Sequence, residues 1–483
     1  MRCAQSASNR AAQEREALAL SAPAESQSHK IGYLVMREGS LEAPVRQSLS
    51  WTEDKFFDEE ELDEEIRRVF DICHGCRRCF NLCDSFPRLF DLIDDAPSGE
   101  LDTVDSKNFK PVVDACTLCD MCFLTKCPYV PPHEFNLDFP HLMLRYRAVE
   151  YRKGMVGTID QEISKTDRNG RMAGRMSTFA NWASDTRNGL TRPFMEAVAK
   201  IDRNASLPTY EGKTFETRAK NAPPEVNAKA PSHGRKAVLY ATCYGNYNSP
   251  EIGVAAQSVL ALNGIETQVV YPTCCGMPQL EHGNIAAVAE SARKVAGELA
   301  PWIEKGFDVV ALMPSCALMM KFEWPLILPE DESVKTLADA SFDITEYIMD
   351  IDKKTGLASG LSPLNGGIAV HFACHARAQN MGAKAAEMMR LIPDAEVDVI
   401  ERCSGHGGSW GIKKDNFETA IKIGRPTALQ ALKSGKKHIV SECPLAGVHI
   451  SQGLDRLADE DAPTHQITAH PIVLFARAYG VDV

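Results

Sequence analysis

Several features that would place this chain in common functional classes are missing from its sequence. No uncharged apolar run approaches the roughly 20 residues needed to span a bilayer, and residues 1–20 lack the basic start and apolar core of a signal peptide. No G-x-G-x-x-G follows a strand in a dinucleotide-binding unit, so we expect no flavin in this chain. The net charge of −12 argues against a nucleic-acid partner. These absences predict a cytoplasmic protein.

Cysteine, by contrast, is abundant. The chain has 16 cysteines in clustered spacings, which indicate a reducing compartment and metal ligation rather than disulfides. Eight of them form two tandem sets, one with the spacing C-x2-C-x2-C-x3-C and one with the spacing C-x2-C-x2-C-x4-C. The two sets are Cys73, Cys76, Cys79 and Cys83, then Cys116, Cys119, Cys122 and Cys127.

Each tandem set predicts one cubane [4Fe–4S] cluster. Three thiolates within seven residues wrap one corner of such a cluster, and the fourth ligand comes from the other set. Cys127 then completes the first cluster and Cys83 the second. Two departures from the usual pattern are the residue after Cys83, which is Asp84 rather than proline, and the longer gap before Cys127.

The alternative to iron–sulfur is structural zinc. Zinc sites usually pair two C-x2-C knuckles across a longer spacer. A third cysteine at the same step, in both sets, favours iron–sulfur clusters, for which soft thiolates are suitable ligands.

The length of 483 residues predicts two or three domains in an α+β multidomain protein. A hairpin is expected over Ile31–Arg46 and an acidic helix over Glu59–Ile72; the acidic run is either a solvated face or a docking patch for a basic partner. A further helical stretch is expected over Met176–Ile201. The predicted boundaries are a disordered leader at 1–30, the hairpin and acidic helix at 31–65, a helical bacterial-ferredoxin-like domain with both clusters at 66–202, a linker rich in proline and alanine at 203–235, and two α/β units at 236–360 and 361–483.

The C-terminal half contains an internal repeat of strands that end near cysteines. Successive cysteine positions are separated by 31 and 42 residues in the first copy and by 29 and 40 in the second, which predicts two α/β units built alike with parallel strands. The predicted strands are Ala237–Thr242, Thr267–Tyr271 and Val309–Met313 in the first copy, and Ile368–Phe372, Glu396–Ile400 and His438–Ser441 in the second.

Loops that follow parallel strands open at one edge of the sheet, so the cysteines of each copy should converge there. The first copy supplies four thiols, enough for a third iron–sulfur cluster, and the second supplies three, which His375 or His406 could complete. The alternative is that these cysteines are small apolar fillers. Cys3 has no expected role. The converging residues are Cys243, Cys274, Cys275 and Cys316, and in the second copy Cys374, Cys403 and Cys443.

The tandem sets followed by two units of the form Cys…Cys-Cys-Gly…Cys-x2-Cys resemble the heterodisulfide-reductase-related iron–sulfur proteins. These include the iron–sulfur subunit of anaerobic glycerol-3-phosphate dehydrogenase, which Cys116–Arg145 resembles especially, and that of glycolate oxidase. The resemblance covers roughly residues 66–483. It implies a non-catalytic electron-transfer subunit that works with an FAD-containing dehydrogenase and passes electrons to a quinone or other acceptor. A membrane anchor subunit, or contact with the inner face of the membrane, would fit the same role.

The chain departs from this family at three of its ten C-terminal ligand positions. In heterodisulfide reductase each unit offers five cysteines to a non-cubane cluster. Here Met319 replaces the fifth cysteine of the first unit, and Ser404 and Ala446 replace two of the second. This pattern favours a single C-terminal cluster.

Two other functions compete with electron transfer. One is a thiol–disulfide reductase that works at the C-terminal cluster, which the Cys-Cys-Gly sequence and the glycine-rich loop Cys403–Gly408 suggest. Tight-turn geometry is the simpler explanation of those glycines. The other is an iron–sulfur redox sensor, but two neighbouring cubane clusters are better suited to electron conduction than to sensing.

Overall fold

The computed structural model describes residues 43–457, 466–468 and 470–482. The predicted leader and residues 31–42 of the predicted hairpin lie outside these ranges, and residues 43–50 form no strand. Within the described ranges, no helix combines the length and apolarity that a membrane crossing requires.

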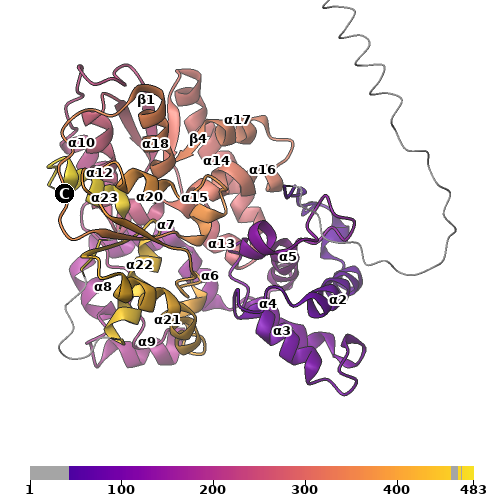
Figure 1. Ribbon diagram of the computed structural model, residues 1–483. Helices are drawn as coiled ribbons and strands as arrows, with labels where there is room; N and C mark the ends of the chain where they lie inside the picture. Colours follow the sequence, from indigo (N-terminus) through magenta and orange to yellow (C-terminus); the bar gives the residue numbers. More distant parts are fainter. Residues whose placement is uncertain (1–42, 458–465, 469, 483) are drawn as a thin grey trace, which may run out of the picture. The chain divides into compact units, whose positions relative to one another are not determined.

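Short helices joined by turns form the region around the tandem cysteines (Figure 1, indigo to violet). The acidic helix predicted over Glu59–Ile72 is confirmed and runs four residues further; its first turn is capped by the Asp58 carboxylate, which accepts from two backbone N–H groups. Buried phenylalanines fill the space between these helices. The elements are η1 (Asp54–Phe57), α2 (Glu59–Cys76), α3 (Ser85–Asp94), η2 (Leu101–Thr103), η3 (Ser106–Phe109), α4 (Lys110–Asp114), η4 (Cys122–Lys126) and α5 (Phe139–Arg152).

Five further helices precede the first sheet. The stretch predicted as helical over Met176–Ile201 is two helices with a turn between them, because the Asn188 side chain accepts from the backbone N–H groups of Leu190 and Thr191 and starts a new helix there. Residues 203–235 include a helix whose Phe215 is fully buried. The helices are α6 (Thr158–Ser164), α7 (Thr166–Arg175), α8 (Ser177–Ser184), α9 (Thr191–Ala199) and α10 (Phe215–Asn221).

The first α/β unit is a four-stranded parallel sheet in the order β2-β1-β3-β4. Four of the five β1 residues are buried, as expected for a central parallel strand covered on both faces. Its strands are β1 (Lys236–Tyr240), β2 (Glu266–Val270), β3 (Asp308–Ala311) and β4 (Ser341–Asp343). Its helices are α11 (Cys243–Tyr247), α12 (Pro250–Leu262), α13 (Met277–Glu281), α14 (Ile285–Glu304), α15 (Pro314–Leu318), η5 (Met319–Glu323), α16 (Trp324–Ile327), α17 (Glu332–Ala340) and α18 (Ile344–Thr355).

The second unit repeats the arrangement with the order β6-β5-β7-β8, again all parallel. Its strands are β5 (Ile368–His371), β6 (Val397–Ile400), β7 (His438–Ser441) and β8 (Gln466–Thr468). Its helices are α19 (Cys374–Arg377), α20 (Lys384–Met389), η6 (Trp410–Ile412), α21 (Phe417–Ser434), α22 (Pro444–Asp455) and α23 (Pro471–Ala478).

The repeat predicted from the cysteine spacing is therefore a repeat of sheet topology. All six predicted strands are present, within one or two residues of the expected bounds. The sequence did not reveal β4 and β8, because three-residue strands carry too little periodicity to detect. Mixed α/β architecture with two parallel sheets is confirmed; the ferredoxin-like nature of the tandem region stays a prediction.

Candidate functional site

The first tandem set is arranged by the end of α2. Cys73 and Cys76 lie three residues apart in its last turn and so share one helix face. The helix stops at Arg77, whose left-handed backbone returns its N–H to the Cys73 carbonyl oxygen at 2.8 Å. Cys79 follows in a turn, and Cys83 lies in the irregular stretch just before α3.

A tight loop arranges the second tandem set. Leu118 and Asp120 both have left-handed backbones, with φ of 49° and 61°, which curl the chain between the cysteines. Cys122 then opens η4, and the Cys127 N–H donates to the Cys122 carbonyl oxygen at 2.8 Å.

The thiols of the two sets form two groups, and the fourth thiol of each group comes from the other set. Burial, followed by the nearby Cys127, Cys79 and Cys76, raises the pKa of Cys73. Burial, followed by Cys119 and Cys116, raises the pKa of Cys83. The first tandem group is Cys73, Cys76, Cys79 and Cys127; the second tandem group is Cys83, Cys116, Cys119 and Cys122.

This donor set fits an iron–sulfur cluster chemically. Burial raises the pKa of Cys122, and the neighbouring Cys116 and Cys119 raise it further, because thiolates repel one another without a cation. A cluster of ferric and ferrous ions supplies that positive charge and binds thiolates directly. Among the described residues, no three His, Cys, Asp or Glu side chains are placed to hold a single metal ion. Ligation by these eight cysteines stays a prediction.

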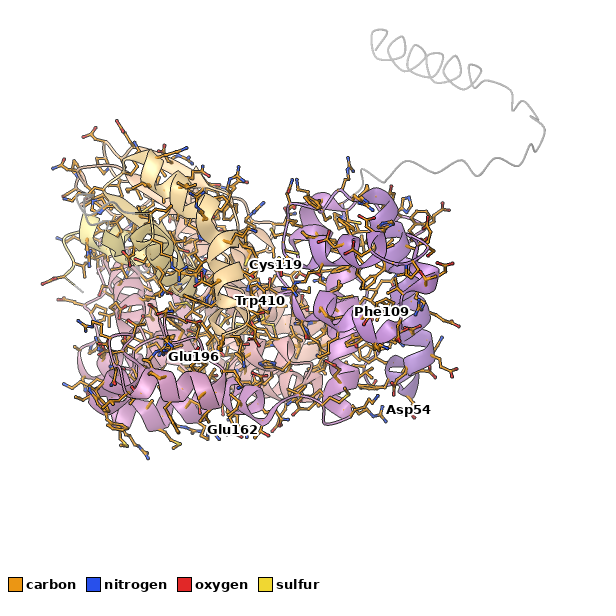
Figure 2. The ribbon with its side chains drawn as sticks, turned by 90° about the horizontal axis from the view of Figure 1, so that it is seen from below. Asp54, Phe109, Cys119, Glu162, Glu196 and Trp410 are labelled. Atoms are coloured by element: carbon orange, nitrogen blue, oxygen red, sulfur yellow. The ribbon has the colours of Figure 1, made fainter. Side chains whose placement is uncertain are left out.

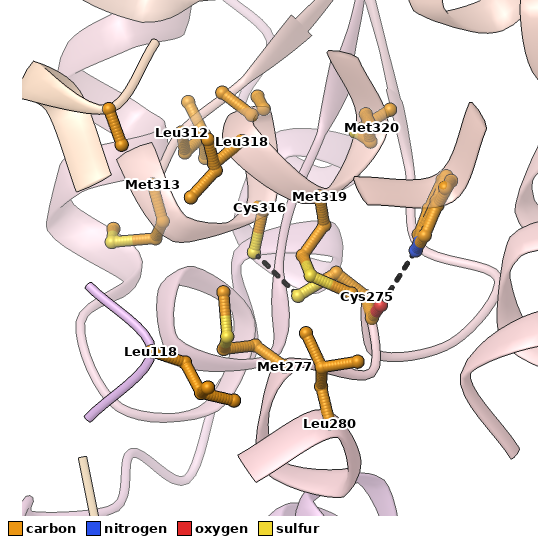
Figure 3. Packing of buried hydrophobic residues seen from close by; sticks show 14 of the residues in the cluster. Leu118, Cys275, Met277, Leu280, Leu312, Met313, Cys316, Leu318, Met319 and Met320 are labelled. Carbon is orange, nitrogen blue, oxygen red and sulfur yellow. Dashed lines mark hydrogen bonds between the residues drawn. The ribbon is translucent and has the colours of Figure 1, made fainter. Parts of the chain in front are cut away.

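The four cysteines of the first unit converge after the strands, as Figure 3 shows for two of them. The Sγ atoms of Cys243 and Cys274 are 3.7 Å apart, and those of Cys275 and Cys316 are 3.3 Å apart. Hydrogen bonding with Cys243 and Cys275 lowers the pKa of Cys274, whereas hydrogen bonding with Cys274 raises the pKa of Cys275. We name this set (Cys243, Cys274, Cys275 and Cys316) the first-unit group.

Apolar side chains enclose the first-unit group. Met319 is fully buried and lies beside Cys275 and Cys316 in Figure 3. Trp324 is also fully buried, and its Nε1–H donates to the Cys275 carbonyl oxygen at 3.1 Å. The group is therefore shielded from water on this side.

A carboxylate from outside the unit holds the loop that carries Cys274. Asp167 of α7 accepts from the Thr273 hydroxyl at 2.7 Å and from the Cys274 N–H at 3.0 Å, and it also pairs with the Tyr271 hydroxyl. Sequence reasoning missed Asp167, because it lies more than 100 residues before its partners and belongs to no cysteine pattern.

The second-unit group, Cys374, Cys403 and Cys443, also converges. Burial, followed by Cys119, Cys403 and Cys443, raises the pKa of Cys374. Cys403 is exposed, and the Gly405 N–H donates to its Sγ at 3.3 Å. The group thus offers three thiols and one open side.

The two histidines proposed to complete this group are placed differently. The Nδ1 of His375 is 2.8 Å from the Ser315 hydroxyl, and its buried ring interacts with the Leu118 backbone, so it faces the second tandem loop. The His406 ring lies next to His449, with centroids 6.2 Å apart. Burial lowers the pKa of His406 to about 3, so the ring is neutral, and its Nε2 is buried without a hydrogen-bond partner. The Nε2 of His375 is likewise buried without a hydrogen-bond partner, so each of the two histidines has a free ligand atom.

The four groups follow one another through the molecule. Cys79 of the first tandem group affects the pKa of Cys122 in the second. After burial, Cys119 of the second tandem group has the largest effect on the pKa of Cys374, which belongs to the second-unit group. Cys316 of the first-unit group in turn acts on Cys443. Figure 2 shows Cys119 and Trp410 where the tandem region meets the second unit.

An ion-pair network fixes the second tandem loop against the first unit. The buried Arg46 guanidinium contacts Asp120 at 2.7 Å, Asp138 at 2.8 Å and Glu323 at 3.0 Å. Burial opposes the charge of Arg46, but the three carboxylates raise its pKa well above the ordinary value. His141 adds a further contact, 3.1 Å from Glu323. The sequence gives no local signal for these long-range pairs.

Comparisons with known proteins identify the repeat. The family described as the CCG cysteine-rich domain matches residues 237–321 and 368–451. A subunit of the anaerobic glycerol-3-phosphate dehydrogenase from Escherichia coli (strain K12) is 27% identical over 326 residues, which cover 65% of this chain and 76% of that protein.

Two further proteins are also similar. A subunit of the fumarate reductase (CoM/CoB) from Methanothermobacter marburgensis is 25% identical over 52% of this chain and 47% of its own length. An uncharacterized iron–sulfur protein from Methanococcus maripaludis is 25% identical over 47% of this chain and 43% of its own length. The chain therefore contains two regions that match the cysteine-rich CCG domain, and it is similar to subunits of two oxidoreductases and to an iron–sulfur protein.

Proposed function

We propose that the protein is an electron-transfer subunit that carries electrons between an FAD-containing dehydrogenase and a quinone or other acceptor. Two [4Fe–4S] clusters are held by the two tandem groups, and a third iron–sulfur cluster is held by the first-unit group. The clusters supply one-electron redox chemistry. The proposal places the protein in the cytoplasm, at the inner face of the membrane.

The serial arrangement of the cysteine groups carries this proposal. After burial, Cys79 helps to raise the pKa of Cys122, Cys119 that of Cys374, and Cys316 that of Cys443, so thiols of successive groups lie within electrostatic reach of one another. A sensor needs only one cluster, whereas neighbouring groups in a row suit conduction. The row has two ends, one at Cys73 near the surface helix α2 and one enclosed by Trp324.

The chain's own residues bury, position and tune the cluster sulfurs. Burial excludes water around Cys122 and Cys316. Backbone N–H groups, such as that of Met121 toward Cys119, stabilise negative charge on sulfur and raise reduction potentials. Asp167 and the Arg46 network keep the loops rigid, which holds the thiols in place.

The relatives of the chain support a dehydrogenase partner. One relative is a subunit of a glycerol-3-phosphate dehydrogenase. Another is lactate utilization protein A from Bacillus cereus, 27% identical over 37% of this chain and 75% of its own length. We therefore propose a partner that oxidises glycerol 3-phosphate or a 2-hydroxy acid.

Metal analysis of anaerobically purified protein tests the proposal. We expect about twelve irons and an equal amount of acid-labile sulfide, with three EPR signals that appear at distinct potentials. Cys3→Ala is the matched control, because this cysteine belongs to no group, and it should leave the iron content unchanged. Zinc in place of iron would overturn the proposal, and about eight irons would remove the third cluster.

A second candidate function is thiol–disulfide reduction at the second unit. The exposed Cys403 in a glycine-rich loop favours it, because a substrate can reach that side of the group. The reaction would split one disulfide into two thiols, with two electrons from the reduced clusters and two protons from solvent. Dithionite-reduced protein, freed of excess reductant, should then be reoxidised by a disulfide; an unchanged cluster spectrum would eliminate this function.

A further inference from the structure

One edge of the second sheet is open. The strand β6 comes first in the order β6-β5-β7-β8, so it has a neighbouring strand on one side only. On that side the Ile368 N–H donates to the Glu396 carbonyl oxygen at 2.8 Å. Backbone groups alternate in direction along a strand, so Val397 and Val399 direct their N–H and C=O groups away from β5. Among the residues that the structure describes, these outward groups have no hydrogen-bond partner.

The matching edge of the first sheet is covered. The strand β2 has the same place in its sheet as β6, and α10 packs against it. This helix belongs to the segment before β1, and its buried Phe215 lies against Gly253 of α12. The segment before β5, residues 356–367, forms no helix. The second copy of the repeat therefore lacks the element that covers this edge in the first.

A groove follows the open edge. With α20 on one side and α21 on the other, β6 lines a cavity of about 530 Å³. Ile400 packs against α21, and strand alternation places Asp398 on this face and the two outward valines on the face toward α20. Four strand residues span about 13 Å, which suits a short extended segment. The polar residues that line this β6 groove are Arg390, Asp398, Gln430, Lys433 and Ser434.

Positive charge in the β6 groove is uncompensated. Arg390 and Lys433 are exposed, and among the described residues neither side chain makes a hydrogen bond or an ion pair. Asp398 also lines the groove, but it already has a positive neighbour. A hydrogen bond with Glu396, and then the charge of Asp398, raise the pKa of Lys436. The two free cations favour an occupant that carries carboxylates.

We propose that the β6 groove binds an extended segment of a partner protein, which pairs with β6 as a further strand and has alternating apolar and acidic side chains. Its backbone satisfies the outward groups of β6, its apolar side chains lie beside Val397 and Val399, and its carboxylates reach Arg390 and Lys433. A second copy of the chain fits poorly. Pairing two β6 strands through their outward groups sets Asp398 opposite its own copy, and like charges directly opposite destabilise a sheet.

The β6 groove leads toward the second-unit group. Ile400 ends β6, and Cys403 follows it by three residues. A partner segment in the groove is therefore held close to the exposed thiol of this group. The groove itself contains no cysteine, and strand pairing requires no metal. The inference is thus independent of the proposed electron-transfer function.

Fluorescence anisotropy of labelled peptides, titrated with the full chain, tests the pairing. The probe is Val-Glu-Val-Glu-Val-Glu-Val with blocked ends, and we expect saturable binding. A probe with lysine in place of each glutamate should bind about tenfold more weakly or worse, because it meets the two cations. A probe with proline at its centre should also bind about tenfold more weakly, because proline interrupts the row of N–H donors. No binding of the first probe, or equal binding of the proline probe, would overturn the proposal.

Variants of the chain separate backbone pairing from charge. Val399→Pro removes an outward N–H and leaves the ladder to β5 intact, so it should weaken binding about tenfold. Val269→Pro is the matched control, because Val269 directs its backbone outward from β2 in the same way and should leave binding unchanged.

Arg390→Glu and Lys433→Glu should each weaken binding of the acidic probe about tenfold and improve binding of the lysine probe. These two variants do not alter the strand, so they test the groove even where proline disturbs the fold. Unchanged binding in both would overturn the proposal. A wild-type dimer that becomes a monomer in the Val399→Pro variant would also overturn it, by assigning the edge to pairing between two copies. Iron content measured on the same samples reports separately on the proposed function.

Discussion

The two α/β units share one backbone plan but differ in what they offer a metal. Both have four parallel strands in the same order, with cysteines after the first three. The first unit has four thiols enclosed by Met319 and Trp324. The second has three thiols, with Cys403 exposed in a glycine-rich loop. Strand order therefore fixes where ligands can meet, and the side chains decide whether they are enough.

The largest expected difference concerns iron retention. Cys275→Ala should remove the third cluster, which would lower the iron content by about four per chain and abolish one EPR signal. Cys403→Ala should leave the iron content within error, because its group has only three thiols. Iron assays on both variants, purified side by side, measure this. Equal loss in both would mean that the second unit also holds a cluster.

Glycine at the third position of each Cys-Cys-Gly or Cys-Ser-Gly sequence provides a test of packing. Both glycines have left-handed backbones, but a Cβ on Gly405 would lie 2.0 Å from the Ala420 carbonyl oxygen, whereas one on Gly276 would lie 3.3 Å from Val288. Gly405→Ala should destabilise the fold by about 3 kcal/mol or more, and Gly276→Ala by about 1 kcal/mol. Thermal unfolding of both variants measures the two destabilisations. A smaller effect at Gly405 than at Gly276 would contradict the prediction.

Glu281, from the first unit, makes a pH-dependent contact with the second. Its carboxylate accepts from the Ser409 N–H at 3.4 Å, and burial raises its pKa to about 7. The folded carboxyl keeps its proton to a higher pH than the unfolded one, so this stabilising effect is complete below about pH 4.5 and is lost as pH rises through 7.

Glu281→Gln should abolish this loss of stability at rising pH. The wild type should lose about 2 kcal/mol of unfolding free energy relative to the variant between pH 5 and 8, as the linkage relation gives. Denaturant titrations at several pH values measure the difference. Parallel pH profiles for the two proteins would contradict the assignment.

The smallest expected effect comes from the enclosure of the first-unit group. Trp324→Phe removes the N–H that donates to the Cys275 carbonyl oxygen but keeps an aromatic ring. It should cost about 1 kcal/mol of stability and leave the iron content unchanged. Thermal unfolding and an iron assay together check this, and iron loss would show that the hydrogen bond also holds the cysteine in place.

Much of this arrangement could be predicted from local patterns. Strand-forming runs that end at cysteines located six of the strands, and the cysteine spacing revealed the repeat. The helix before Cys73 was predictable because its cap and acidic first turn are adjacent in sequence.

The remaining features depend on distant residues. Asp167 holds the Cys274 loop, and Arg46 joins Asp120 to Glu323, through contacts that no local pattern encodes. The serial order of the cysteine groups likewise follows from how the second unit packs on the second tandem loop. Asn188 divides the predicted long helix because a single side chain caps two backbone N–H groups there.

The Arg46 network has a consequence for biosynthesis. Arg46 and Glu323 are 277 residues apart, so the ribosome releases Arg46 long before its partner exists. During that interval Asp120, which lies inside the second tandem set, has an incomplete set of partners. Domains emerge and fold from the N-terminus during synthesis, but the ion pairs of this loop are complete only after Glu323, which follows β3, has been translated. The final set of ion pairs around the second tandem set is thereby tied to the synthesis of a later part of the chain.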